Sequence, residues 1–128
     1  IFKFNAEDRV GNSSKEETYK VSVDTEAPLV TLLPSSTLYT RGVTSYAPRS
    51  YTYAAAATDA GSGVQDLLVS IDGGEAFPYR APLAFATEGS HSIEAQARDN
   101  VGNVSGKIRI DVTVDDNPPK LQLIPSVK

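Results

Sequence analysis

Three short segments of the chain carry carboxylate and amide side chains of the kind that hold calcium. They are V-D-T-E-A-P at residues 23–28, D-A-G-S-G at residues 59–63 and D-N-V-G-N at residues 99–103. Their candidate ligands are Asp24, Glu26, Asp59, Asp99, Asn100 and Asn103. Ca²⁺ takes roughly six to eight oxygen ligands at about 2.3–2.6 Å. A fold that brings the three segments together would therefore create a calcium site, and the sequence suggests no other cofactor.

Turn capping is the alternative role for the same residues. Asp and Asn side chains commonly accept hydrogen bonds from backbone N–H groups nearby in a turn, and Gly supplies the positive φ that turns need. The D-x-[DN]-x-[DN]-G loop of an EF-hand is absent from the sequence. Both roles stay open at the level of sequence.

The sequence holds no catalytic constellation. His91 is the single histidine, and its neighbours Ser90 and Ser92 would point to the opposite face of a strand. The chain has no Cys, which excludes thiol chemistry and Cys-ligated zinc. The Gly pairs at 61/63 and 73/74 lack the helix that follows a phosphate-binding loop. We therefore expect a protein that is not an enzyme.

Aromatic residues offer one further kind of site. Six of them lie in the middle of the chain: Tyr39, Tyr46, Tyr51, Tyr53, Phe77 and Tyr79. Exposed, coplanar rings would stack on sugars, whereas rings packed within and between strands would serve the core. The first arrangement would indicate a carbohydrate-binding module, which is the alternative function that the sequence leaves open.

An internal repeat indicates the elements that must position these residues. Residues 1–37 align without a gap to residues 92–128, an offset of 91, and 13 of the 37 positions are identical. The clearest match joins A-E-D-R-V-G-N at residues 6–12 to A-R-D-N-V-G-N at residues 97–103. A period of this length fits one β-sandwich domain of a tandem array. The predicted units are 1–26, the last strands of one repeat; 27–115, a complete repeat; and 116–128, the first strand of the next.

The residue pattern predicts strands throughout and no helix. Ile108, Ile110, Val112 and Val114 alternate with polar residues, as in a strand with one buried face. Similar signals predict strands at 29–33, 51–58, 64–71, 75–77, 83–86, 91–98 and 107–114, with a short edge strand at 38–41. The predicted fold class is an all-β, Ig-like antiparallel sandwich of about seven strands. Its topology places the incoming linker, the 59–63 loop and the 99–103 hairpin at one end.

The amino-acid composition limits the classes of partner that the protein is expected to bind. The net charge is −4, from 16 acidic and 12 basic residues, which argues against nucleic acid. No apolar run approaches the ~20 residues of a transmembrane helix. We expect no nucleic-acid partner and no membrane span.

The middle of the chain resembles a bacterial Ig-like repeat of the leptospiral outer-membrane-protein type, often labelled a β-barrel domain. Four segments carry the resemblance in order: A-T-D-A-G-S-G-V, V-S-I-D-G-G, F-P-Y-R-A-P-L and E-G-S-H-S-I-E-A-Q-A-R-D-N-V-G-N. The V-D-T-E-A-P junction is similar to the linkers of large repetitive bacterial adhesins, some of which bind calcium there. Such repeats occur in tandem in surface adhesins and secreted multidomain proteins, and the resemblance implies no catalytic residue.

These observations predict an extracellular or cell-surface spacer module that supports adhesion, and they leave open whether its acidic junctions are stiffened by calcium or only cap turns. The second linker supplies Asp115, Asp116 and Asn117, so an equivalent site would recur. The expected partners are neighbouring repeats of the same polypeptide and a host or matrix protein or glycan. The alternative is an accessory module of a secreted polysaccharide-degrading enzyme.

Self-association is a further expectation. Apolar residues near both ends would lack sheet partners within the chain: Phe2, Phe4, Val21, Val23, Leu121, Leu123 and Ile124. Such segments invite pairing with another chain. Strand complementation between the two ends of different molecules is therefore predicted.

Overall fold

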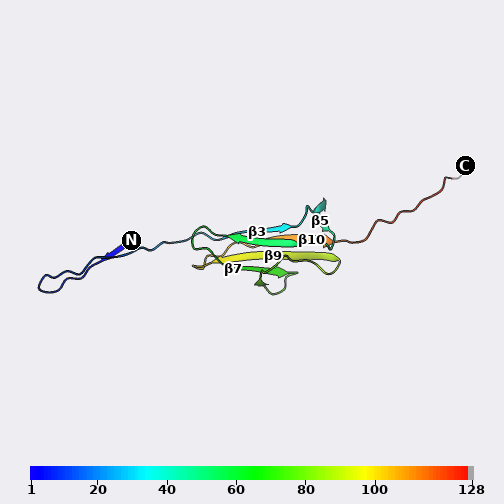
Figure 1. Cartoon of the computed structure of the whole chain (residues 1–128). Helices are drawn as coiled ribbons and strands as arrows, with labels where there is room; N and C mark the ends of the chain where they lie inside the picture. Colours follow the sequence, from blue (N-terminus) through cyan, green and yellow to red (C-terminus); the bar gives the residue numbers. More distant parts are fainter. Residues whose placement is uncertain (127–128) are drawn as a thin grey trace.

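Two β-sheets packed face to face make up the body of the protein, as the predicted sandwich requires (Figure 1). The computed structural model describes residues 1–126. Six strands form one sheet in the order β4-β5-β10-β9-β7-β8, and β3 pairs with β6 in the other. The bounds are β3 Leu29–Pro34, β4 Tyr39–Arg41, β5 Thr44–Ala47, β6 Tyr53–Thr58, β7 Val64–Ile71, β8 Phe77–Pro78, β9 Gly89–Asp99 and β10 Ile108–Val114. All pairings are antiparallel except that of β5 with β10.

The core lies between the two sheets and follows the predicted alternation. Ile93 and Ala95 of β9 are buried, whereas Glu94 between them is half-buried. Tyr53 of β6 is fully buried, and its ring packs against Phe85 with the centroids 5.3 Å apart. Period-two burial of small and β-branched side chains therefore fixes which face of each strand is inside.

The strand predicted at 75–77 is found at Phe77–Pro78, and two larger corrections are needed within the sandwich. The predicted strand at 83–86 is wrong in extent, because only Leu83 pairs, through two hydrogen bonds with Tyr53 of 2.8 and 2.9 Å. Phe85 leaves the ladder to fill the core. Strand β5 lies in a Ser/Thr/Gly/Pro-rich stretch where the sequence predicts an edge strand at 38–41, found as β4, but no strand at 44–47. It exists because β10 offers its edge to Tyr46 and Ala47.

The N-terminal segment forms a separate hairpin, β1 (Phe2–Phe4) with β2 (Glu17–Tyr19), which lies away from the sandwich in Figure 1. Its register repeats that of β9 and β10 at the offset of 91. Phe2 pairs with Tyr19, and Ile93 pairs with Ile110. The predicted strand pair is confirmed, although β2 ends before Val21 and the apolar side chains are exposed.

The chain enters and leaves the sandwich at opposite ends (Figure 1). We call the end reached by residues 20–28 the entry pole and the end left by residues 115–119 the exit pole. Residues 115–126 form no strand, whereas the sequence predicts one for residues 116–128, of which 127 and 128 lie outside the described residues. The equivalent strand β3 is held by β6, whereas no described strand pairs with residues 115–126.

Candidate functional site

Three carboxylates converge at the entry pole, one from each predicted segment. Asp24 comes from the linker, Asp59 from the loop between β6 and β7, and Asp99 from the end of β9. One carboxylate oxygen of each lies within 4.8 Å of the others. The sandwich topology therefore brings together side chains that lie up to 75 residues apart in the sequence.

Asp99 is completely buried and caps its own hairpin. Its Oδ1 accepts hydrogen bonds from the backbone N–H groups of Val101 (2.9 Å) and Asn103 (2.8 Å), and its Oδ2 accepts one from Asn103 Nδ2 (2.7 Å). Burial acts to raise the pKa of Asp99. The hydrogen bonds from the Asn103 side chain and from the backbone outweigh burial and lower that pKa below its ordinary value. The carboxylate is therefore held ionised inside the turn.

Asp24 ties the incoming linker to the same pole. Its Oδ2 accepts a hydrogen bond from Ser62 N (2.7 Å), its Oδ1 accepts one from Glu26 N (3.1 Å), and its backbone oxygen accepts one from Asn103 Nδ2 (3.2 Å). The carboxyl group lies so close over Gly61 that a Cβ there would overlap it. The Ser62 side chain and backbone N–H, with the Glu26 N–H, lower the pKa of Asp24, and the charge of Asp99 opposes this shift. The Ser62 hydroxyl lies near without forming a well-aligned hydrogen bond to any described residue.

The other predicted ligands have different roles. Asp59 caps its own loop by accepting a hydrogen bond from Gly63 N (2.7 Å). Asn100 points its amide nitrogen at the backbone oxygens of Ser62 (2.8 Å) and Gly63 (3.1 Å). Glu26 is exposed and is not a member of the carboxylate cluster. Hydrogen bonds from Asn100 and Asn103 therefore connect the loops, while only three of the six residues contribute a clustered carboxylate.

The N-terminal hairpin contains a second copy of the D-x-V-G-N turn, and this copy shows the capping role apart from any carboxylate cluster. Asp8 accepts hydrogen bonds from Val10 N (2.9 Å), Asn12 N (2.9 Å) and Asn12 Nδ2 (2.8 Å), the same set that Asp99 accepts. Gly11 and Gly102 have matching φ values of 90° and 98°. Asp8 forms these bonds while exposed and outside any cluster of three metal-binding side chains among residues 1–126. The D-x-V-G-N motif therefore caps its turn without requiring a metal.

The three carboxylates of the entry pole nevertheless suit a hard cation in their chemistry. Their negative charges repel each other, as the effect of Asp99 on Asp24 indicates. Asp59 uses one oxygen for capping and leaves the other without a partner among the described residues. Ca²⁺ would need several further oxygens, from water or carbonyl groups, to reach its usual coordination number.

The exit pole holds the outgoing linker by a different set of contacts. Asp116 accepts a hydrogen bond from the Arg49 backbone N–H (2.8 Å) and forms a salt bridge with its side chain (3.2 Å). Asn117 Nδ2 donates a hydrogen bond to Glu88 (3.2 Å), and its backbone N–H donates to Asp115 (2.9 Å). The bond from Asn117 to Asp115 repeats the bond from Glu26 to Asp24 at the offset of 91. Sequence reasoning missed Arg49, whose placement depends on the loop between β5 and β6.

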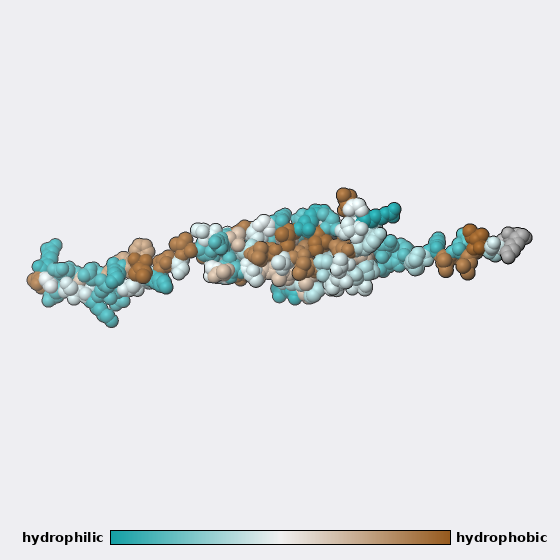
Figure 2. Space-filling view, turned by 90° about the horizontal axis from the view of Figure 1, so that it is seen from above, coloured by the Kyte–Doolittle hydropathy of each residue, from teal (hydrophilic) through white to brown (hydrophobic). Residues whose placement is uncertain are grey.

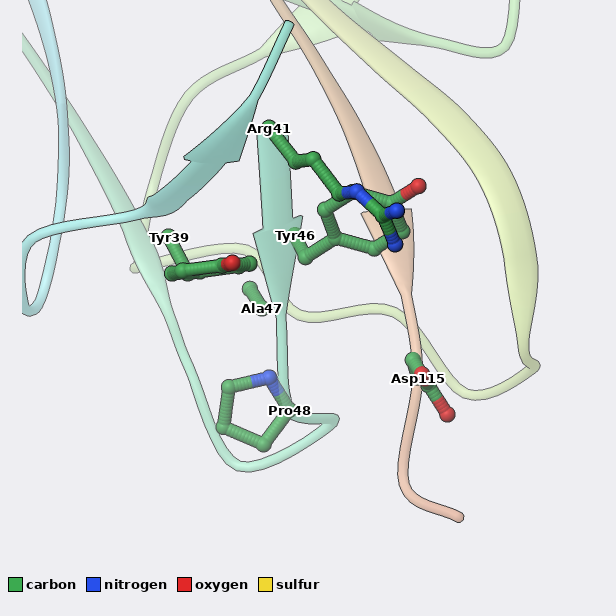
Figure 3. Close-up of a pocket in the computed structure, with 6 residues that line it drawn as sticks. All are labelled: Tyr39, Arg41, Tyr46, Ala47, Pro48 and Asp115. Atoms are coloured by element: carbon green, nitrogen blue, oxygen red, sulfur yellow. The ribbon is translucent and has the colours of Figure 1, made fainter. Parts of the chain in front are cut away.

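A groove of about 470 Å³ lies beside the exit pole, between the β4–β5 hairpin and the end of β10 (Figure 3). It is lined by Tyr39, Arg41, Tyr46, Ala47, Pro48 and Asp115. The rings of Tyr39 and Tyr46 are 6.3 Å apart and inclined at 45°. Tyr53 is buried, and Tyr51 and Tyr79 pack against the core. Phe77 is exposed but stacks with none of the other five rings, so the six aromatic residues form one tilted tyrosine pair and no coplanar platform among the described residues.

His91 is half-buried and pins two turns together. Its Nδ1 lies 2.9 Å from Asp72 Oδ2, and its Nε2 lies 3.0 Å from the Thr87 backbone oxygen. The ring stacks on Phe85 with the centroids 4.4 Å apart. Both ring nitrogens thus serve local structure, which accounts for a lone histidine at this position.

No protein-family model and no curated protein matches the chain. The resemblance to the leptospiral Ig-like repeat stays a prediction. Within residues 1–126, no helix of the length and apolarity needed to cross a bilayer is present.

Proposed function

We propose that this chain is a non-catalytic spacer module of a large bacterial surface or secreted protein, and that the parent protein supports adhesion. The observation that carries the proposal is the pair of anchored linkers at opposite poles. Asp24 holds the incoming linker through Ser62, and Asp116 holds the outgoing linker through Arg49. Because a linker is fixed to each pole of the sandwich, the orientation of one module is passed on to the next, as a spacer requires.

The repeated hairpin supports a tandem array. The β1–β2 pair has the register, turn hydrogen bonds and glycine conformation of β9–β10 at a constant offset of 91. A segment that forms the same hairpin twice is best explained by duplication of the whole unit. Neighbouring units of the same polypeptide are therefore the first partners to expect.

The anchoring of the outgoing linker gives a direct test of the spacer proposal. Amide ¹⁵N relaxation should find residues 115–117 as rigid as β10. The variant Asp116→Ala, which removes both contacts with Arg49, should make residues 116 and 117 mobile on the nanosecond timescale. Arg98→Ala is the matched control, because it removes the 4.0 Å surface ion pair with Asp66 far from the linker. Mobile linker amides in the unmodified chain would remove the basis for an oriented spacer.

Calcium at Asp24, Asp59 and Asp99 is proposed as an additional stiffening element of the junction at the entry pole. Saturation at about 100 times Kd would add roughly 2.7 kcal/mol of stability. A chain of this size should then melt on the order of ten degrees higher in calcium than in chelator. Asp59→Asn should abolish the response while keeping an acceptor for Gly63 N. Equal melting temperatures in calcium and chelator would leave the carboxylates as turn caps alone.

A carbohydrate-binding or accessory role is the second candidate, favoured only by the Tyr39–Tyr46 groove. Its tyrosine rings, with Arg41 and Asp115, combine apolar faces with charged hydrogen-bonding groups. Retention on a polysaccharide column that Tyr39→Ala abolishes would support it. Passage without retention over a panel of plant and bacterial polysaccharides would count against it.

A further inference from the structure

The outer face of the β3–β6 sheet carries no charge. Alternate residues of the two strands point outward, and all six are exposed: Leu29, Thr31, Leu33, Ala54, Ala56 and Thr58. Leu29 and Leu33 are 68% and 63% exposed. Figure 2, the view from above, shows hydrophobic residues gathered over the middle of the sandwich, on the side where β3 lies in Figure 1.

The outer face of the other sheet has the opposite character. Arg109 forms ion pairs with Asp111 (2.6 Å) and Glu94 (3.2 Å), and Lys107 also reaches Glu94 (3.5 Å). A chain of net charge −4 carries a net repulsion between its copies. At the β3–β6 face, two copies can approach without bringing like charges together.

Strand β3 also has a free edge with hydrogen-bonding groups turned toward it. Tyr53 exchanges both backbone hydrogen bonds with Leu83, so its partner Pro34 in β3 belongs to a pair without hydrogen bonds. Pairs of the two kinds alternate in an antiparallel ladder. Leu29, Thr31 and Leu33 therefore bond to β6, while the N–H and C=O groups of Val30 and Leu32 face away from it. Within residues 1–126, β3 pairs with no strand other than β6.

The free edge is self-complementary about Thr31. If β3 pairs antiparallel with a second β3 across a twofold axis at Thr31, Val30 lies opposite Leu32 of the other copy. The outward-facing N–H and C=O groups of these two residues then bond to each other. Leu29 meets Leu33 on the uncharged face, and such cross-strand apolar pairs stabilise a sheet. Pro28 and Pro34, at the two ends, confine the ladder to these residues.

We propose that β3 pairs edge to edge with β3 of a second copy of this chain, which joins the two uncharged faces into one four-stranded surface. This contact differs from complementation through the chain ends, since it uses only the sandwich. It goes beyond the spacer function, which does not depend on it.

A single engineered cysteine tests the pairing, because the chain contains no other. At the axis, two Thr31 Cα atoms would lie about 4.5 Å apart, within the range of about 4.4–6.8 Å that a disulfide spans. Thr58→Cys is the matched control on the same face, since the two β6 strands would be separated by three strand spacings, about 14 Å. Under mild oxidation, Thr31→Cys should form a disulfide dimer on the order of ten times faster than Thr58→Cys, because pairing raises its effective concentration.

Sedimentation velocity of the unmodified chain gives the second measurement. The mass should rise with concentration up to about 1 mM, and Thr31→Lys should abolish the rise by placing two ammonium groups face to face. Circular dichroism and a thermal melt of each variant confirm that it is folded. A monomer at every concentration, or equal oxidation of the two cysteine variants, would overturn the proposal. A dimer that survives Thr31→Lys would also overturn it and would point to the terminal segments.

Discussion

Two copies of one turn motif in different surroundings allow a sharp prediction. Asp99→Ala should destabilise the protein strongly, whereas Asp8→Ala should leave the sandwich almost unchanged. Both carboxylates accept the same three hydrogen bonds. They differ because Asp99 is buried in the sandwich, whereas Asp8 is exposed in a hairpin that lies outside the sandwich.

The magnitude follows from the donors that lose their acceptor. Asp99→Ala leaves the N–H groups of Val101 and Asn103 and the Asn103 side-chain amide without that carboxylate, in a partly buried site. A buried donor without a partner is costly, and each lost bond should lower the melting temperature by several degrees. The expected total is a fall on the order of ten degrees. Water replaces the carboxylate around Asp8, so the fall there should be below about two degrees.

Thermal melts followed by circular dichroism at neutral pH, in chelator, are the assay. Asp99→Asn serves as an intermediate variant, since its amide oxygen can still accept bonds from the two backbone N–H groups while its NH₂ opposes Asn103 Nδ2. It should fall between the unmodified chain and Asp99→Ala. Equal shifts for Asp8→Ala and Asp99→Ala, or no shift for either, would refute the reasoning that burial decides the role of the motif.

Three further outcomes are expected. Hydrogen bonds from the His91 side chain and the Ser92 N–H lower the pKa of Asp72, and hydrogen bonds also lower that of Asp24. The unfolded chain therefore binds more protons than the folded chain at low pH. The free energy of unfolding should stay constant at pH values above the ordinary Asp pKa of 3.8 and decline as the pH falls below it. This decline should be shallower in Asp72→Asn. Gly61→Ala should displace the Asp24 carboxyl group and speed exchange of the Ser62 amide hydrogen, whereas Gly106→Ala, which has open space around it, should not. The Tyr53 hydroxyl is buried without a partner among the described residues, so Tyr53→Phe should stabilise the fold by up to about 1 kcal/mol in urea titrations; a loss of stability would show that the hydroxyl is satisfied in solution.

Local pattern accounts for most of the strands. The bounds of β7 agree with the prediction at both ends, and β10 agrees to within one residue, because alternating apolar residues allow only one face to be buried. The prediction failed at β5 and at residues 83–86, where pairing depends on the free backbone groups of a strand that is distant in the sequence. β5 forms because β10 has a free edge, and Leu83 pairs through a single residue of β6.

In the candidate site too, some features follow from the local sequence and others from the tertiary structure. Repetition and turn chemistry by themselves determined that D-x-V-G-N forms a hairpin turn, since its hydrogen bonds are local and recur at Asp8 and Asp99. Only the tertiary structure decided that Asp99 is buried beside Asp24 and Asp59 while Asp8 is exposed. The bonds that a residue makes with its near neighbours follow from the local sequence. Burial, repulsion between carboxylates and the anchoring of Asp116 by Arg49 depend on distances between segments that are remote in the chain, and these distances are set by the packing of the two sheets.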